Sequence, residues 1–246
     1  MPIYTKLQVP SFDLNWLSLP RSSGKDQEFA ILVPGGGGSG KTGVKNMVQV
    51  IDINKSGTVE FLNSYETGSK ICTSVTSGIV EKADANILVV CLGFDDGQCQ
   101  LLEAFKNEGE KNIEFRELVI FQADFSAEYS CINCSQIFSN GIILTGGEDG
   151  ICRLWKLSHN DKKWSVMKES DVSKQDGSIT SMSIHPFKPW MSISSKDGTI
   201  VVINSESFRI IGRAVSSSGI YSSIYIYYYY YYYYYYYYYY YYHYYY

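Results

Sequence analysis

A short unit, two strand-like runs joined by an Asp-Gly turn, recurs along this chain of 246 residues. The turns are Asp96-Gly97, Asp149-Gly150 and Asp197-Gly198, so their glycines lie 53 and 48 residues apart. Asp-Gly suits a tight type I′ hairpin, in which both central positions take a positive φ. Strand pairs that return at such a period are typical of a β-propeller, in which each repeat supplies strands to a blade.

The glycine-rich stretch 35–46 satisfies the P-loop pattern G-x-x-x-x-G-K-[ST]. A P-loop holds phosphates only where its glycines run into a helix. Here the following run, Met47–Ile53, has Val or Ile at four of seven positions and favours a strand. The stretch also falls in phase with the repeat, with Phe29–Val33 as the preceding strand. We therefore predict two antiparallel strands within 31–53, joined by an enlarged hairpin loop that binds no ATP or GTP.

Charge and hydropathy argue against two classes of partner. The formal net charge of −4 gives no general reason to bind nucleic acid. No run of about 18 apolar residues is present to span a bilayer as a helix. The first residues also lack the apolar segment of a secretion signal. On these grounds the chain as given is expected to be cytosolic.

The end of the chain differs in composition from the rest, because 21 of its 24 tyrosines fall in the last 26 residues. A tyrosine homopolymer has neither the polar/apolar alternation nor the turn signals that set a strand register. We therefore divide the chain into a propeller segment, 1–215, and a low-complexity Tyr-rich tail, 216–246. The tail is interpreted as the end of a truncated sequence.

The chemically reactive side chains are interpreted as structural, and no catalytic residue is predicted. The six cysteines lie in apolar runs and are expected to be reduced and buried. Cys131 and Cys134 form a lone C-x-x-C without the second ligand pair of a zinc site, so core cysteines are favoured. His185 has no partner acid or nucleophile patterned near it. Asp95 is expected to be a turn residue and not a Walker B acid.

Several segments together resemble one known family. Gly147–Trp155 is similar to a WD-repeat hairpin, and 35–46 matches the pattern G-G-G-G-x-x-K-T-G-[IV]-K-N throughout. That loop is the hallmark of the Sec-twelve type of guanine nucleotide exchange factors for the Sar-type small GTPase. Gln98–Leu102, Gln122–Ser126 and Gly146–Leu157 also resemble segments of this family, in the same order.

The resemblance implies an all-β, WD-repeat β-propeller with about four of the family's seven blades. It implies a regulator of a GTPase and not an enzyme of covalent chemistry, which promotes COPII vesicle formation at the endoplasmic reticulum. The family's location, the cytosolic face of that membrane, depends on a C-terminal helix that has no counterpart here. The loop would contact the GTPase and hold a potassium ion. The candidate contact residues are Gly35, Gly36, Gly37, Gly38, Lys41, Thr42, Gly43, Lys45 and Asn46.

Two other functions remain open at this point. A WD-repeat scaffold without exchange activity would account for the blades alone. A P-loop NTPase would account for the glycine motif alone, and it requires a helix that starts at Lys41 or Thr42.

Overall fold

The computed structural model describes residues 7, 9–19, 29–38, 43–53, 58–81, 86–107, 110–160, 163–185 and 187–215. Within these ranges the chain forms sixteen strands and no helix. The strands pair antiparallel in four sheets of four, each a meander in chain order, which we call blades 1 to 4. The prediction of an all-β propeller with about four blades is confirmed, whereas the tail 216–246 lies outside the described residues.

Each blade takes four consecutive strands. Blade 1 contains β1 (Asn15–Ser18), β2 (Phe29–Gly35), β3 (Asn46–Ile53) and β4 (Val59–Gly68). Blade 2 contains β5 (Cys72–Val80), β6 (Ile87–Phe94), β7 (Gln98–Phe105) and β8 (Glu114–Gln122). Blade 3 contains β9 (Ile132–Ile137), β10 (Ile142–Gly147), β11 (Ile151–Asn160) and β12 (Lys163–Lys174). Blade 4 contains β13 (Ile179–Ile184), β14 (Trp190–Ser195), β15 (Thr199–Asn204) and β16 (Ile210–Val215).

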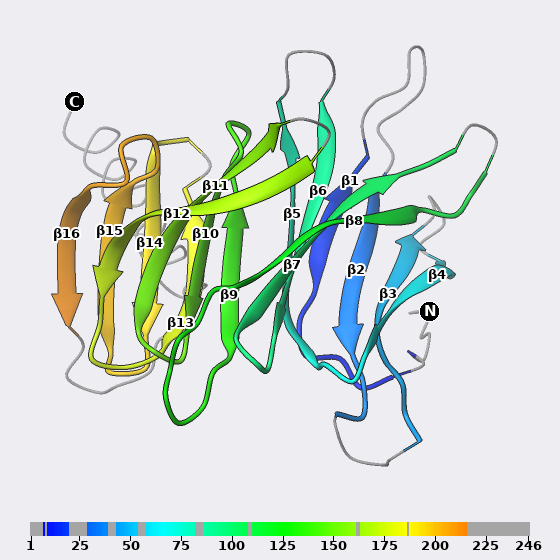
Figure 1. Cartoon of the computed structure of the whole chain (residues 1–246), viewed down its shortest axis with the longest axis horizontal. Helices are drawn as coiled ribbons and strands as arrows, with labels where there is room; N and C mark the ends of the chain where they lie inside the picture. Colours follow the sequence, from blue (N-terminus) through cyan, green and yellow to red (C-terminus); the bar gives the residue numbers. More distant parts are fainter. Residues whose placement is uncertain are drawn as a thin grey trace, which may run out of the picture.

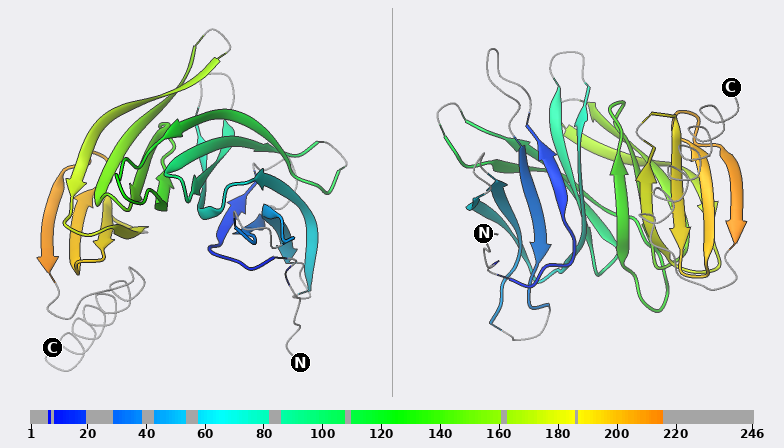
Figure 2. Two further views of the ribbon diagram at one scale, coloured as in Figure 1. Left: turned by 60° about the horizontal axis from the view of Figure 1, so that its bottom comes forward. Right: turned by 180° about the vertical axis from the view of Figure 1, so that it is seen from behind.

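The four blades stand side by side in chain order (Figure 1). The left view of Figure 2 shows that they follow an open arc, with blade 1 and blade 4 at its two ends. The first strand of each blade lies on the inner side of this arc, and β5 lies against both β1 and β9. Corresponding strands of the four blades run in the same direction, so the turns between second and third strands all lie at one end of the molecule, the lower end in Figure 1.

The core fills the spaces between neighbouring blades, because central strands bury both faces. On β6, Leu88, Val90 and Leu92 pack against blade 1, whereas Val89 and Cys91 pack against blade 3. This alternation follows from the two-residue period of a strand. A strand that is covered on both sides reads as a continuous apolar run, which explains why 87–92 has no polar residue.

The Asp-Gly turns differ from the predicted type I′ form. Gly97, Gly150 and Gly198 have φ of 77°, 72° and 83°, but the Asp before each glycine is not among the residues with positive φ. Each glycine N–H donates to the carbonyl three residues earlier, for example to Phe94 at 3.1 Å. This is a three-residue hairpin loop in which a turn is followed by a left-handed glycine. The Asp carboxylates instead accept the N–H two residues on, from Gln98, Ile151 and Thr199.

Candidate functional site

The glycine-rich loop joins two antiparallel strands of blade 1. β2 ends at Gly35 and β3 begins at Asn46, with Gly35 paired to Met47. The predicted strand–loop–strand arrangement within 31–53 is confirmed, and a helix does not follow the loop in the residues that the structure describes from 43 onward. Lys41 and Thr42, together with residues 39 and 40, lie outside the described residues. The glycine motif therefore does not have the P-loop context.

Three of the described glycines in the loop are sites where a larger side chain does not fit. A Cβ on Gly35 would lie 1.8 Å from the Pro10 carbonyl oxygen, which also accepts the Gly36 N–H at 3.1 Å. Gly36 has a φ of +154°, and a Cβ there would lie 2.2 Å from Asn46 Oδ1. Gly38 has a φ of +81° beside Ile71. The glycines therefore permit both the unusual backbone and its close packing.

Asn46 holds the loop closed from inside. Its Oδ1 accepts the Gly38 N–H at 3.0 Å, and its Nδ2 donates to the Gly38 carbonyl at 3.2 Å. Nδ2 also donates to the Gly68 carbonyl at 3.2 Å, at the end of β4. The side chain is 4% exposed. Asn46 is therefore a loop anchor, and its amide is not presented at the surface.

Charged side chains next to the loop are paired. Lys45 Nζ lies 2.5 Å from Glu66 Oε1, with both side chains largely exposed. Lys70, on the connection to blade 2, lies 2.9 Å from Asp96 Oδ2. Lys45 belongs to the glycine motif and was predicted, whereas Glu66 and Ile71 were not, because residues on β4 and beyond carry no motif. Of the predicted site residues, the structure brings together Gly35, Gly36, Gly38 and Asn46, with Lys45 at the edge.

Asp95 and His185 have the structural roles that the sequence predicted. The Asp95 carboxylate accepts the Ile71 N–H at 3.0 Å, which fixes the turn of blade 2 to the connection from blade 1. His185 Nδ1 accepts the N–H groups of Phe187 and Lys188 at 3.1 and 3.2 Å. Both side chains therefore stabilise turns.

The cysteines are core residues. All six are free, and all but the half-buried Cys134 are buried. Among the described residues, no group of three or more His, Cys, Asp or Glu side chains is placed to hold a metal ion. The same part of the chain contains no helix long and apolar enough to cross a bilayer.

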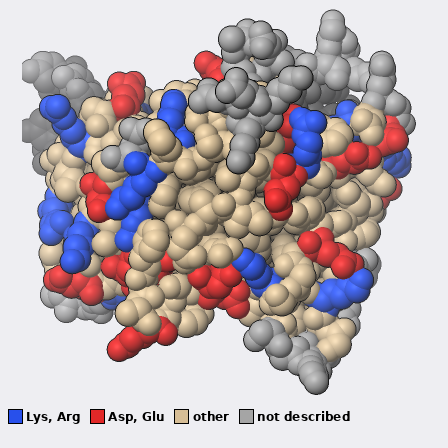
Figure 3. All heavy atoms as spheres, in the orientation of Figure 1, with Lys and Arg blue, Asp and Glu red and all other residues tan. Residues whose placement is uncertain are grey.

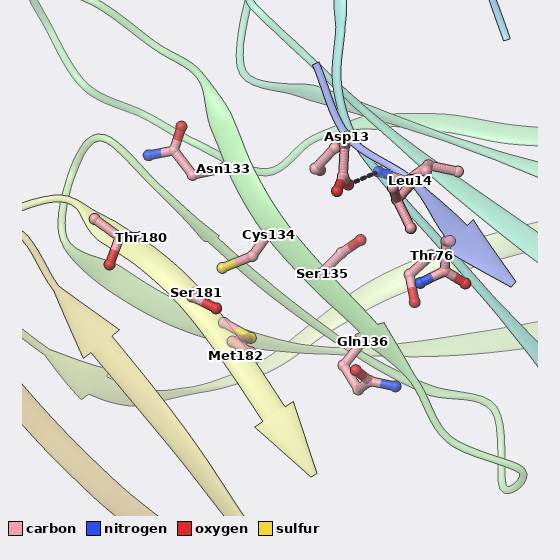
Figure 4. Close-up of a pocket in the computed structure, with 13 residues that line it drawn as sticks. Asp13, Leu14, Thr76, Asn133, Cys134, Ser135, Gln136, Thr180, Ser181 and Met182 are labelled. Carbon is pink, nitrogen blue, oxygen red and sulfur yellow. Dashed lines mark hydrogen bonds between the residues drawn. The ribbon is translucent and has the colours of Figure 1, made fainter. Parts of the chain in front are cut away.

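A second candidate site is a polar hollow on the inner side of the arc, between the first strands of the four blades (Figure 4). Asp13, Ser74 and Ser135 line it, and burial raises the pKa of the Asp13 carboxyl. Asp13 Oδ2 accepts the Val75 N–H at 2.9 Å, whereas the Ser74 and Ser135 hydroxyls have no partner among the described protein groups. Hydroxyls of this kind in a hollow that is open to solvent are commonly bound by ordered water.

On the face seen in Figure 3, which carries the outer strands of the blades, basic and acidic side chains are interspersed and neither charge dominates. The glycine loop and the inner hollow contain no nucleophile activated by a neighbouring base in the described residues. In the described part of the loop, the Asn46 side chain holds the backbone of Gly38 by two hydrogen bonds.

Comparison with known proteins supports the propeller fold. Residues 121–156 and 169–204 match the family model "WD domain, G-beta repeat". Each match begins on the outer strand of one blade and continues through the three inner strands of the next. In the residues that the structure describes, the chain is all-β, and its WD repeats fall on blades 3 and 4 of a β-propeller arrangement.

The chain is also similar to a curated protein and to a solved structure. The chain is 25% identical over 198 residues to the guanine nucleotide-exchange factor SEC12 of Rattus norvegicus, a distant homology that covers 63% of this chain. That stretch spans 43% of the rat protein, so the chain matches less than half of this curated relative. A solved structure of a humanized mutant of the Chaetomium thermophilum Polycomb Repressive Complex 2, bound to the inhibitor GSK126, is 13% identical with a TM-score of 0.51. It covers 79% of this chain and 38% of that chain, and supports the fold alone.

Proposed function

We propose that this chain belongs to a guanine nucleotide exchange factor that activates a Sar-type small GTPase for COPII vesicle formation. In this proposal it acts on the cytosolic face of the endoplasmic reticulum membrane and corresponds to prolactin regulatory element-binding protein, the animal member of the Sec-twelve family. The observation that carries the proposal is the glycine loop of blade 1, closed by Asn46. The distant homology to an exchange factor supports it.

An exchange factor needs a surface, not reactive groups. It must bind the nucleotide-free GTPase more tightly than the loaded form, and nucleotide binding is then weakened by the same factor. A loop whose backbone is fixed before binding loses little conformational freedom when the partner docks. Asn46 supplies this rigidity by bonding both backbone groups of Gly38. The loop residues 35–38 and 43–46 are then the part of blade 1 that contacts the GTPase.

A potassium ion within the loop is part of the same proposal. The described loop offers backbone carbonyl oxygens and the Asn46 amide oxygen, and neutral oxygens of this kind are the ligands that potassium takes in proteins. Glycine at positions 36 and 38 permits the positive φ of the loop backbone, a conformation from which carbonyls can converge on a cation. Residues between Gly35 and Asn46 would hold the ion. When bound, it would tie several carbonyls together and stiffen the loop.

The proposal is tested by GDP release from a Sar-type GTPase. The full chain should accelerate release, and Asn46→Ala should reduce that acceleration by roughly 10-fold or more, since two backbone groups of Gly38 lose their partner. Asn140→Ala is the matched control, because the Asn140 side chain also accepts a backbone N–H, from Ile142 at 3.1 Å. Asn140 lies in the turn between β9 and β10, at the end of the molecule opposite to the glycine loop. It should leave exchange unchanged.

The possible outcomes separate the candidate functions. No acceleration by the unaltered chain would contradict the exchange-factor proposal. If Asn46→Ala accelerates GDP release as much as the unaltered chain does, the loop has no role in exchange. A WD-repeat scaffold is the second candidate, favoured by the WD matches on blades 3 and 4, which lie outside the loop. Binding of the GTPase without faster GDP release would support the scaffold.

A further inference from the structure

We infer that the connection between β8 and β9, residues 123–131, is a second contact for the small GTPase, with Phe125 and Tyr129 as its apolar anchors. This inference rests on the proposed function and extends the interface from blade 1 to the junction of blades 2 and 3. It names a surface that neither the glycine motif nor the WD matches assign.

Both aromatic side chains face solvent although they lie in one short connection. Phe125 and Tyr129 are each 58% exposed, so neither is needed to fill the core. Phe and Tyr are both enriched in protein interfaces, and Tyr is among the residue types that supply most of the binding energy there. A single exposed aromatic residue needs no explanation, but two in nine residues form a small apolar patch.

Phe125 is held in place from below by a buried cation. The Arg153 guanidinium lies 5.0 Å from the centre of the Phe125 ring, and Arg153 is 4% exposed. Its Nη1 lies 2.7 Å from Asp149 Oδ2 and donates to the Ala123 carbonyl at 3.1 Å. One face of the ring thus rests on a fixed guanidinium. The remaining surface of the ring is left for a partner.

The backbone of the connection is fixed by two carboxylates. Asp149 Oδ2 accepts the Phe125 N–H at 3.0 Å. The buried Asp124 accepts the N–H groups of Ser126 at 2.7 Å and Asp149 at 3.1 Å. Ser130 Oγ donates to the Ser126 carbonyl at 3.0 Å. A surface ordered before binding retains more of its contact energy as affinity.

The connection lies at the same end of the molecule as the glycine loop, the lower end in Figure 1. A continuous series of contacts links the glycine loop to this connection. Gly38 lies beside Ile71, whose N–H donates to Asp95. The same turn packs on the connection, because a Cβ at Gly97 would lie 2.7 Å from Ser130 Cβ and 2.9 Å from the Asp124 carbonyl. One globular partner that touches the loop can therefore reach this connection across blade 2.

The opposite end of the molecule offers a control. Phe187, between β13 and β14, is 82% exposed, more than either anchor. Its ring lies beside His185, without a buried cation beneath it in the described contacts. If exposure alone made a contact, Phe187 would be the better site. Phe125 and Tyr129 differ from Phe187 because they lie at the end of the molecule that carries the glycine loop. The Phe125 ring also rests on the buried Arg153 guanidinium.

The test measures binding of nucleotide-free Sar-type GTPase to the full chain, immobilised in its unaltered form and as single variants. Phe125→Ala and Tyr129→Ala should each raise Kd by roughly 10-fold, the loss typical of an interface anchor. Phe125→Tyr keeps the ring and should retain binding within roughly twofold. Phe187→Ala should match the unaltered chain. Thermal unfolding of each variant, expected to be unchanged for these exposed positions, confirms that the fold persists.

The outcomes distinguish this inference from the proposed function. Loss of binding in both alanine variants, with Phe187→Ala unaffected, supports the second contact. If the unaltered chain binds the GTPase and the two variants bind equally well, the second contact is wrong and the exchange-factor proposal stands. If the unaltered chain does not bind the GTPase, both are overturned.

Discussion

Arg153 joins three segments of the chain through one buried side chain. It lies on β11, pairs with Asp149 in the preceding turn and donates to the carbonyl of Ala123 at the end of blade 2. The side chains of Arg153 and Asp149 are 5% and 10% exposed, so water screens this pair weakly. At such a site the pair stabilises the fold chiefly because either charge alone would be costly.

Replacing Arg153 by Met should therefore lower the free energy of unfolding by about 3–5 kcal/mol, since Asp149 is left buried and uncompensated. Urea unfolding measures the loss. The double variant Arg153→Met with Asp149→Asn should lose less than the two single losses together. Arg116→Met is the control: its partner is Glu103, its side chain is 65% exposed, and its loss should stay below about 1 kcal/mol. Strict additivity of the two single losses would contradict this account.

At the scale of the element, the buried strands of the blades carry thiols into the spaces between blades. Cys72, Cys99 and Cys152 are fully buried on β5, β7 and β11. Burial raises the pKa of Cys72 and Cys99 well above the usual value, and raises that of Cys152 to about 12. The thiolate is the reactive form of cysteine. These three side chains are therefore protonated and shielded at neutral pH.

Thiol labelling at pH 8 should show this protection. Because each pKa lies above the pH of the experiment, these cysteines remain thiols in the folded chain. They should react with a maleimide at least roughly 100-fold more slowly than in urea, at a rate set by opening of the sheets. Mass spectrometry of digested peptides assigns the labelled sites. Fast labelling of Cys152 under native conditions would show that the space between blades 3 and 4 is open.

At the scale of the whole molecule, the arc has an exposed apolar face at blade 1. Along β1 and β2, Leu17 and Leu32 point into the core shared with blade 2, whereas Trp16 and Phe29 point to the other side. Trp16, Phe29 and Ile53 are 57%, 50% and 43% exposed. Apolar surface of this kind favours association with another apolar surface.

Polar substitution on this face should reduce self-association. In the double variant Phe29→Thr with Ile53→Thr, threonine keeps the preference for a strand and removes apolar area. We expect a smaller rise of the sedimentation coefficient with concentration than in the unaltered chain. Because both side chains are about half exposed, the free energy of unfolding should fall by only about 1–2 kcal/mol. The tail is common to both proteins, so an unchanged concentration dependence would show that this face does not drive association.

Local sequence was sufficient to predict the second and third strands of each blade. These strands are buried on both faces and read as apolar runs, and the Asp-Gly turns mark where they reverse. The strand preference of 47–53 was also sufficient to exclude a helix after the glycine motif. The outer strands β8 and β12 were not predicted, because half-exposed strands such as 163–174 carry many polar residues and no clear alternation.

The tertiary structure alone decided the details of both candidate contacts. Asn46 closes its loop partly through Gly68, 22 residues away, and Phe125 rests on Arg153 from the following blade. The form of the Asp-Gly turns was likewise set by the register of the paired strands and not by the dipeptide. The sequence by itself determined which segments become strands and where they turn, because those preferences act between neighbouring residues. Contacts between distant residues depend on how blades pack, so only the folded arrangement determined them.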